Sequence, residues 1–143
     1  MTEAQKILSM IESVSPDDTA KLDEIDARVW CYLNNRDIFL HYAIKDHPPL
    51  FYFRDDTKPW GKTYIPDYLH DENWQYTRSR DALKAIRPDG FFIASIQENI
   101  DGEGWTCSLD NEDKSFWSPY SKTEELAELH AIIQAIEYER GEK

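Results

Sequence analysis

The stretch Tyr76–Ile96, YTRSRDALKAIRPDGFFIASI, holds a helix start, a short helix, a helix stop and a strand in that order. Ser79 is a good N-cap because its hydroxyl can accept a hydrogen bond from a free N–H group of the first turn. Pro88 moves the residue before it out of the helical conformation, and Gly90 is free to take a positive φ in the following turn. Phe91–Gln97 then carries apolar residues on both faces, which predicts a central strand covered on both sides. We therefore expect this unit to be the architectural centre of the fold.

Outside this unit the sequence predicts three further helices. Residues 2–13 carry an apolar stripe, and the Ser-Pro-Asp-Asp sequence that follows predicts a second helix with Ser15 as its N-cap, ending at Asn34-Asn35. Ser121–Glu124 fits a capping box that opens the final helix, which is expected to run to about Glu139. The wide apolar stripe of that last helix is typical of a helix that packs on a sheet.

Five further strands are predicted, most of them separated by turn residues. They are Ile38–Ile44, Leu50–Arg54, Trp60–Ile65, Trp105–Leu109 and Lys114–Trp117. The first two of these are expected to form an antiparallel pair, and Pro66–Gln75, which has no period, is expected to be a loop. The predicted fold class is α+β, a mainly antiparallel sheet of about five or six strands with helices packed on it, in one domain that spans residues 1–143.

The chain is strongly acidic, with a formal net charge of −12 over 143 residues. Phosphate backbones repel such a chain, so we expect no direct binding of nucleic acid. An acidic surface can dock on a basic protein, although acidic charge also serves solubility alone. No apolar run is long enough for a membrane span and the N-terminus does not resemble a signal peptide, so we expect a cytoplasmic protein without membrane contact.

Motifs that would indicate catalysis or metal binding do not stand out. Cys31 and Cys107 have no paired spacing, which favours two buried thiols over a disulfide or a metal pair. The hairpin loop 98–104, ENIDGEG, does not fit the spacing of an EF-hand. We expect no catalytic residue, no metal and no cofactor. The four histidines are isolated in the sequence: His41, His47, His70 and His130.

Residues 51–80 are unusual, because they contain eight of the chain's 19 aromatic residues, interleaved with basic ones. Aromatic and basic side chains together form protein interfaces or pockets for nucleotide-like ligands, whereas the commoner interpretation is that half of these aromatics are core. If a pocket exists, Trp60, Tyr64 and Arg80 are expected to be partly exposed and to converge. The candidate ligand- or partner-binding residues are Arg54, Trp60, Lys62, Tyr64, Tyr68, Trp74, Tyr76, Arg78 and Arg80.

Three segments are similar to the phage ABA sandwich domain family, small phage and prophage proteins of unassigned function. Asp17–Val29, DDTAKLDEIDARV, resembles the opening of that family, and Leu126–Ile132, LAELHAI, resembles its closing helix. Tyr76–Leu83 followed by Pro88–Phe91 is similar to the family's "YT-x-S-x-D-A" helix and its Pro–Gly turn. The resemblance implies a viral origin and an α/β/α sandwich, and it assigns no activity and no functional residue.

These observations together favour a non-enzymatic phage or prophage accessory protein that counters host defence by binding, in the cytoplasm of the infected host cell. The first mechanism we expect is masking of a basic surface of a host defence protein through the acidic surface. The alternative is a sponge that sequesters a nucleotide-like immune signal in the 51–80 segment. A structural or virion-assembly role, and an enzyme with a site built from scattered residues, remain further alternatives. The sequence leaves open a homo-oligomer.

Overall fold

A computed structural model describes residues 2–40, 51–64 and 72–141. The helices and strands of these ranges establish the predicted α+β class. The helical elements are α1 (Glu3–Ser13), α2 (Thr19–Leu33), the short 3₁₀ helix η2 (Glu72–Trp74), α3 (Arg80–Ile86) and α4 (Glu124–Gly141). The strands are β1 (Phe39–Leu40), β2 (Phe51–Arg54), β3 (Lys62–Tyr64), β4 (Phe92–Glu98), β5 (Trp105–Asp110) and β6 (Ser115–Trp117).

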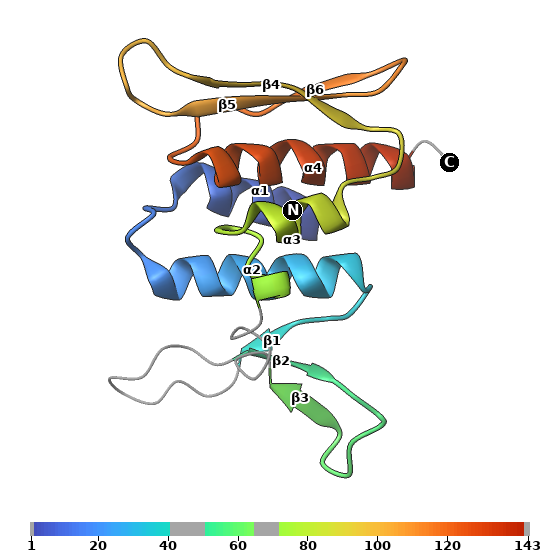
Figure 1. Ribbon diagram of the computed structural model, residues 1–143. Coiled ribbons are helices and arrows are strands. Elements are labelled where there is room, and N and C mark those ends of the chain that lie inside the picture. The colour runs from blue at the N-terminus through green and yellow to red at the C-terminus, as the bar shows by residue number, and fades with distance from the viewer. Residues whose placement is uncertain (1, 41–50, 65–71, 142–143) are drawn as a thin grey trace.

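The described strands form two separate antiparallel sheets, β1-β2-β3 and β4-β5-β6. The prediction of one sheet of about five or six strands is therefore wrong. Figure 1 shows the two sheets as the outer layers with the helices between them, whereas an α/β/α sandwich has its sheet in the middle. Each sheet has one apolar face: Phe51 and Phe53 of β2 cluster with α2, and Cys107 and Leu109 of β5 belong to the larger core around α4. Each apolar face is buried against a different helix, so the two sheets can remain separate.

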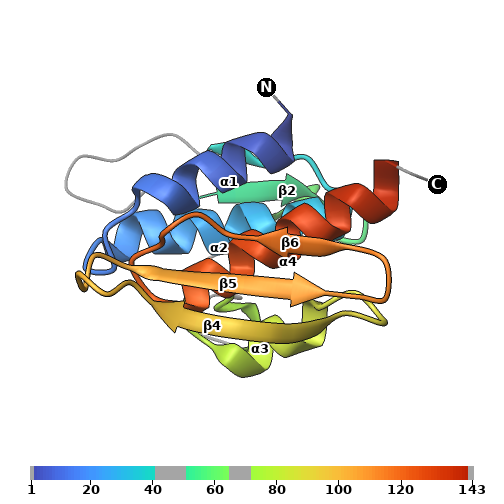
Figure 2. The same cartoon turned by 90° about the horizontal axis from the view of Figure 1, so that it is seen from above.

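Helix α4 is the centre of the fold, a place that the sequence assigned to Tyr76–Ile96. It contacts the β4-β5-β6 sheet, with β5 as the main partner, and also α1 and α3. Figures 1 and 2 show it lying directly against that sheet with α1 and α3 on its other side. A helix that is buried on several sides is a core helix rather than an amphipathic cover. Its buried residues are Leu126, Ala127, Glu128, Leu129, His130, Ala131, Ile132, Ile133, Ala135 and Ile136.

Strand β4 is an edge strand with one exposed face, not a central strand covered on both sides. Phe91 is buried just before it, but Phe92 is 55% exposed. The pairing register with β5 shifts between Ile93 and Ser95, which marks a β-bulge. The bulge lets Ile93 and Ile96 both pack against the core although they are three residues apart. The bulge therefore explains why apolar residues occur at both odd and even positions of β4, although only one of its faces is buried.

The helix starts follow the predicted chemistry at one place and shift by a few residues at another. The Ser79 hydroxyl accepts a hydrogen bond from the backbone N–H of Ala82 at 3.2 Å, which confirms the predicted N-cap of α3. Helix α2 does not begin at Ser15, because that hydroxyl accepts from the N–H of Asp17 within a turn. The N-cap is Asp18, whose carboxylate accepts the N–H of the third helical residue at 3.2 Å.

The start of α4 is corrected in the same way. The backbone of Ser121 pairs with that of Trp105, with N–O distances of 2.7 and 2.8 Å. Ser121 is therefore committed to a β-bridge and cannot act as the first residue of a capping box. The Thr123 hydroxyl accepts from the N–H of Leu126 at 3.2 Å and caps the helix instead.

Helix α2 ends where the paired asparagines predicted. Asn35 takes a φ of 55°, and the N–H of Arg36 bonds the carbonyl of Cys31 at 2.8 Å. A left-handed residue followed by such a bond is the Schellman arrangement, and asparagine tolerates it better than most residues. The antiparallel pairing of β1 with β2 is confirmed by Phe39 opposite Tyr52. Other predictions lie outside the described residues: the rest of the strand Ile38–Ile44, part of the loop Pro66–Gln75, and His41, His47 and His70.

Candidate functional site

Three of the candidate binding residues, Arg54, Trp60 and Lys62, lie on the β2–β3 hairpin. Arg54 and Lys62 are opposite one another in the pairing register. The Arg54 guanidinium lies 5.4 Å from the ring centroid of Phe39, and the Lys62 amine lies 4.7 Å from that of Tyr52. Both cations thus cover aromatic faces of their own sheet. Trp60, in the turn of the hairpin, is 64% exposed.

Two further candidates are packing residues. The Trp74 ring stacks on Trp30 of α2 with a centroid distance of 4.4 Å, and Trp30 in turn packs on Phe53 at 4.7 Å. Tyr76 is only 5% exposed and belongs to the main core. These aromatics attach the β2–β3 region and the segment before α3 to α2. They are packing residues, in agreement with the commoner interpretation of the aromatics in residues 51–80.

Arg78 is held by two carboxylates of α2. Its Nη2 atom donates to Asp26 Oδ2 at 2.6 Å and to Asp23 Oδ1 at 2.7 Å. The other oxygen of Asp26 accepts the N–H of Thr77 at 2.8 Å. Asp26 is completely buried, and this burial raises the pKa of its carboxyl to about 6, while the hydrogen bonds from Arg78 and Thr77 act in the opposite direction. The arrangement fastens the chain before α3 to α2 and uses Arg78 structurally.

The residues expected to converge on a pocket are distributed over the molecule. Arg80, at the start of α3, forms an ion pair with Glu124 of α4 at 3.4 Å. Trp60 lies at the end of the β2–β3 hairpin, which Figure 1 shows in the opposite outer layer from α4 and its sheet. Tyr68 and the side chain of Tyr64 lie outside the described residues. The structure therefore groups Arg54, Trp60 and Lys62, and it brings none of them together with Arg80.

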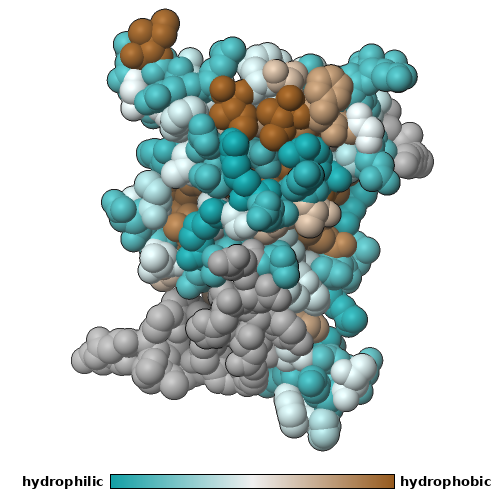
Figure 3. All heavy atoms as spheres, viewed as in Figure 1, coloured by the Kyte–Doolittle hydropathy of each residue, from teal (hydrophilic) through white to brown (hydrophobic). Residues whose placement is uncertain are grey.

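The outward face of the β4-β5-β6 sheet is a surface that the sequence analysis did not single out. Within the described residues no element lies over it, and Figure 2 shows the three strands in front of α4. We call it the sheet face and define it by six residues that the pairing register places on one side: Phe92, Ser95, Ser108, Asp110, Ser115 and Trp117. Phe92 and Trp117 are exposed by 55% and 53%, respectively. Figure 3 views this sheet from its β4 edge, where a group of hydrophobic atoms lies on an otherwise mostly hydrophilic side of the molecule.

Small hydroxyl residues form the part of the sheet face between its aromatics. The hydroxyls of Ser108 and Ser115 donate to the same oxygen of Asp110, at 2.8 and 2.6 Å. These hydrogen bonds lower the pKa of Asp110, so its carboxylate is ionised at neutral pH. Ser108 itself is only 1% exposed, although it faces outward on the middle strand. The sheet face is thus a strip in which an anion held by two hydroxyls, that of buried Ser108 and that of exposed Ser115, lies between two exposed aromatic rings.

Acidic loops border the sheet face at both ends. Residues 92–117 contain six acids and one lysine. The acids fall in the β4–β5 loop, at the adjoining end of β4, and around the β5–β6 turn. The β4–β5 loop also presents Ile100, whose side chain is fully exposed. Two exposed aromatics on a polar strip with an acidic rim are the composition expected of a surface that docks on a basic partner.

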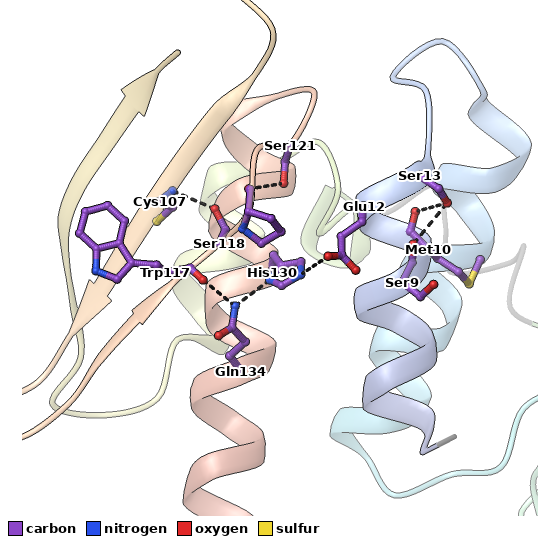
Figure 4. Close-up of polar contacts among 11 residues, drawn as sticks. Ser9, Met10, Glu12, Ser13, Cys107, Trp117, Ser118, Ser121, His130 and Gln134 are labelled. Atoms are coloured by element: carbon purple, nitrogen blue, oxygen red, sulfur yellow. Dashed lines mark hydrogen bonds and ion pairs between the residues drawn. The ribbon is translucent and has the colours of Figure 1, made fainter. Parts of the chain in front are cut away.

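His130 is a second group that sequence reasoning treated as isolated. Figure 4 shows its ring between Gln134 and Glu12. The Gln134 side-chain nitrogen lies 2.8 Å from His130 Nδ1 and also donates to the carbonyl of Trp117 at 2.9 Å. His130 Nε2 lies 3.9 Å from a carboxylate oxygen of Glu12 on α1. An i+4 amide on the same helix was visible in the sequence, whereas the contact with α1 depends on the tertiary fold.

The surroundings of His130 do not form a nucleophile–base pair. Burial lowers the pKa of His130 to about 4, so the ring is neutral at pH 7. The nearby Ser118 hydroxyl accepts a hydrogen bond from the N–H of Cys107 at 2.9 Å. Burial raises the pKa of the Cys107 thiol to about 12, which keeps it protonated and unreactive. Cys31 is likewise buried and free, so both thiols are packing groups as expected.

Glu128 of α4 is a buried carboxyl that the sequence analysis also missed. It is 1% exposed, and burial raises its pKa while Arg87 and Arg80 oppose that effect. It lies within the Leu- and Ala-rich run of α4, where a single acid does not interrupt the helical pattern. Among the described residues no three His, Cys, Asp or Glu side chains gather in a way that could hold a metal ion.

The neutral state of His130 predicts how acid affects stability. Its pKa is depressed in the folded state, so the stability it contributes is present above pH 6.5 and is lost as pH falls toward 4. Asp26, with its raised pKa of about 6, acts in the opposite direction over part of this range. The difference in pH dependence between the native chain and His130→Gln does not contain the contribution of Asp26, because Asp26 is present in both proteins and its contribution cancels. Between pH 7 and pH 5 the native chain should lose about 2 kcal/mol more of its free energy of unfolding than the variant.

Urea denaturation of both proteins at the two pH values measures this difference. An equal or larger loss in His130→Gln would show that the histidine is not held neutral.

Comparisons with known proteins do not assign a family. No protein-family model, no curated protein and no solved structure matches this chain. Over the ranges that the structure describes, none of the helices has the length and apolarity needed to cross a bilayer.

Proposed function

We propose that this protein acts by binding, and that the sheet face docks on a basic surface of a partner protein. The observation that carries the proposal is the pair of exposed aromatics, Phe92 and Trp117, on a sheet face without a covering element among the described residues. Aromatic side chains on a rigid surface lose little conformational entropy on binding and commonly dominate interface energetics. Because they project from paired strands, their backbone positions are fixed before a partner arrives.

Charge supports a basic partner rather than an apolar one. The acids that border the sheet face are part of the net charge of −12 that the whole chain carries. Long-range attraction of a cationic surface would speed the encounter, and the aromatics would then slow dissociation. The fixed carboxylate of Asp110 offers a bonding partner for a lysine or arginine near the middle of the contact.

The biological setting of this binding comes from the sequence resemblance to phage proteins. In that setting the partner is a basic surface of a host defence protein, and the protein counters defence by masking it without catalysis. The alternative of a nucleotide sponge in residues 51–80 has less support, because the described candidates there are spread over a hairpin, the core and two ion-paired arginines.

A capture experiment with matched variants tests the proposal. The double variant Phe92→Ser/Trp117→Ser removes both aromatics of the sheet face, and Trp60→Ser removes an aromatic of similar exposure from the other sheet. All three side chains are exposed, so each variant should fold with little change in stability. Tagged proteins are incubated with lysate of a bacterial host, and bound proteins are identified by mass spectrometry.

We expect at least one basic protein to be retained by the native chain and by Trp60→Ser and to be lost from the double variant. Loss of the hot-spot aromatics should weaken binding by about 30-fold or more. Equal capture by all three proteins, or capture of no basic protein, would contradict the proposed docking surface.

A further inference from the structure

A polar cleft of about 540 Å³ lies between α1, the C-terminal end of α2 and the C-terminal end of α4. It contains no residue of the sheet face. Four cations line it, Lys6, Arg28, Arg36 and Arg140, in a chain that has 16 basic residues against 28 acidic ones. Such a gathering of positive charge runs against the overall charge of the protein.

The charge of one of these cations is already compensated. Arg28 donates to Glu24 at 2.9 Å and to Glu3 at 3.2 Å, and its side chain is 12% exposed. Tyr32, which also lines the cleft, adds no negative charge because burial, with Glu137 nearby, raises its pKa to about 12. The balance of the cleft therefore depends on the other three cations.

Two of the three are arginines that have no carboxylate partner among the described residues. Arg140 donates to the carbonyl of Tyr32 at 3.2 Å, and its guanidinium lies 4.3 Å from the ring centroid of the same tyrosine. Arg36 donates to the carbonyl of Arg54 at 3.4 Å and lies 5.7 Å from the ring centroid of Phe53. Carbonyl bonds and aromatic faces fix these guanidinium groups and leave their charge in place.

Lys6 and Asp37 complete the charge of the cleft. The Lys6 amine is exposed and makes no hydrogen bond or ion pair with the described residues, and Asp37 is the one further acid among the lining residues. The charge of Arg28 is balanced by that of Glu3. The remaining three cations and the single anion Asp37 give the cleft a local charge of +2. The cleft is therefore suited to an anion with more than one negative charge.

We propose that this cleft binds a small phosphate-bearing molecule. Guanidinium groups held in fixed positions match the oxygens of a phosphate, and a lysine adds a flexible point charge. The volume lies in the range of small-ligand sites, with room for more than one phosphate group or for a phosphate and an attached organic part. This site is independent of the sheet face, so either can be correct without the other.

Isothermal titration calorimetry with defined probes tests the site. The probes are inorganic phosphate, pyrophosphate, AMP and the uncharged adenosine, titrated into the native chain and into Lys6→Gln/Arg36→Gln. Both replaced side chains are exposed, so the variant should retain its melting temperature. Lys58→Gln/Lys62→Gln changes the net charge equally on the β2–β3 hairpin and serves as the matched control.

We expect pyrophosphate or AMP to bind the native chain and the control with similar affinity, and the cleft variant about tenfold or more weakly. Stronger binding of AMP than of pyrophosphate would identify a ligand with an organic part, and the reverse would identify a polyphosphate. No measurable binding of any phosphate probe would overturn the proposal. It would also be overturned by equal binding of adenosine or by equal loss in the control variant.

Discussion

Replacing Arg78 with alanine should lower the free energy of unfolding by about 3 kcal/mol at pH 8. Removal of one partner leaves Asp26 as an uncompensated buried carboxylate, and broken buried pairs cost roughly 3–5 kcal/mol. The lower end applies because the Arg78 side chain is 32% exposed, so solvent screens part of its interaction. Urea denaturation of the native and variant proteins measures the loss.

The loss in Arg78→Ala should depend on pH. Without the arginine, the pKa of Asp26 rises further above its value of about 6. A carboxyl with a raised folded-state pKa destabilises the fold as pH rises through that pKa, so the deficit should be smaller at pH 5 than at pH 8. Asp26→Asn in the same background, which removes the buried charge, should recover part of the stability at pH 8. A deficit that grows toward low pH would contradict this explanation.

Replacing Leu129 with alanine should cost about 3–4 kcal/mol. The side chain is fully buried on α4, the helix that contacts both the β4-β5-β6 sheet and α1. The loss combines the transfer free energy of the three carbon atoms removed with the cost of the cavity that remains in a close-packed interior. Denaturation in urea, with an unchanged slope against denaturant, would identify this as a loss of packing.

Ile100→Ala is the matched control, because Ile100 is an aliphatic residue that is fully exposed in the β4–β5 loop. Its replacement should change the free energy of unfolding by less than about 0.5 kcal/mol. Equal effects at Leu129 and Ile100 would mean that α4 is not the centre of the core.

Local signals in the sequence predicted much of the secondary structure. Ser79 caps α3 as expected because that choice depends on a hydroxyl and three neighbouring residues. Ser15 and Ser121 were equally good candidates locally, but one is used in a turn and the other in a bridge to Trp105. The bridge of Ser121 arises from a tertiary contact, and the turn at Ser15 is a local alternative that the same residues allow, so the local pattern does not show which use is made.

The arrangement of layers depends on contacts that no pattern carries. Alternation in β4 was misread because a bulge between Ile93 and Ser95 shifts the residues that face the core. The division into two sheets could not be inferred, since a strand pattern states which face is apolar and not which strand is its neighbour. The same pattern of apolar and alanine residues that predicted a helix on a sheet for α4 also fits a helix buried on several sides.

The candidate binding residues show the same limit. Interleaved aromatic and basic residues in 51–80 left open a common site beside the commoner interpretation as core, and in the structure Trp74 and Tyr76 pack inward while Arg78 and Arg80 pair with acids. The cations of the cleft are distant from one another in sequence, from Lys6 to Arg140, so only the fold brings them together. Phe92 was counted as core because the bulge was not visible.

The most direct measurement of the docking surface is the association rate of the captured basic partner as a function of ionic strength. Rates are recorded by stopped-flow fluorescence from about 50 to 500 mM salt for the native chain and for Phe92→Ser/Trp117→Ser. Attraction between an acidic rim and a basic surface predicts an association rate that falls about tenfold or more over this range, with faster dissociation in the variant. An association rate of the native chain that does not change with salt would contradict docking through the acidic sheet face.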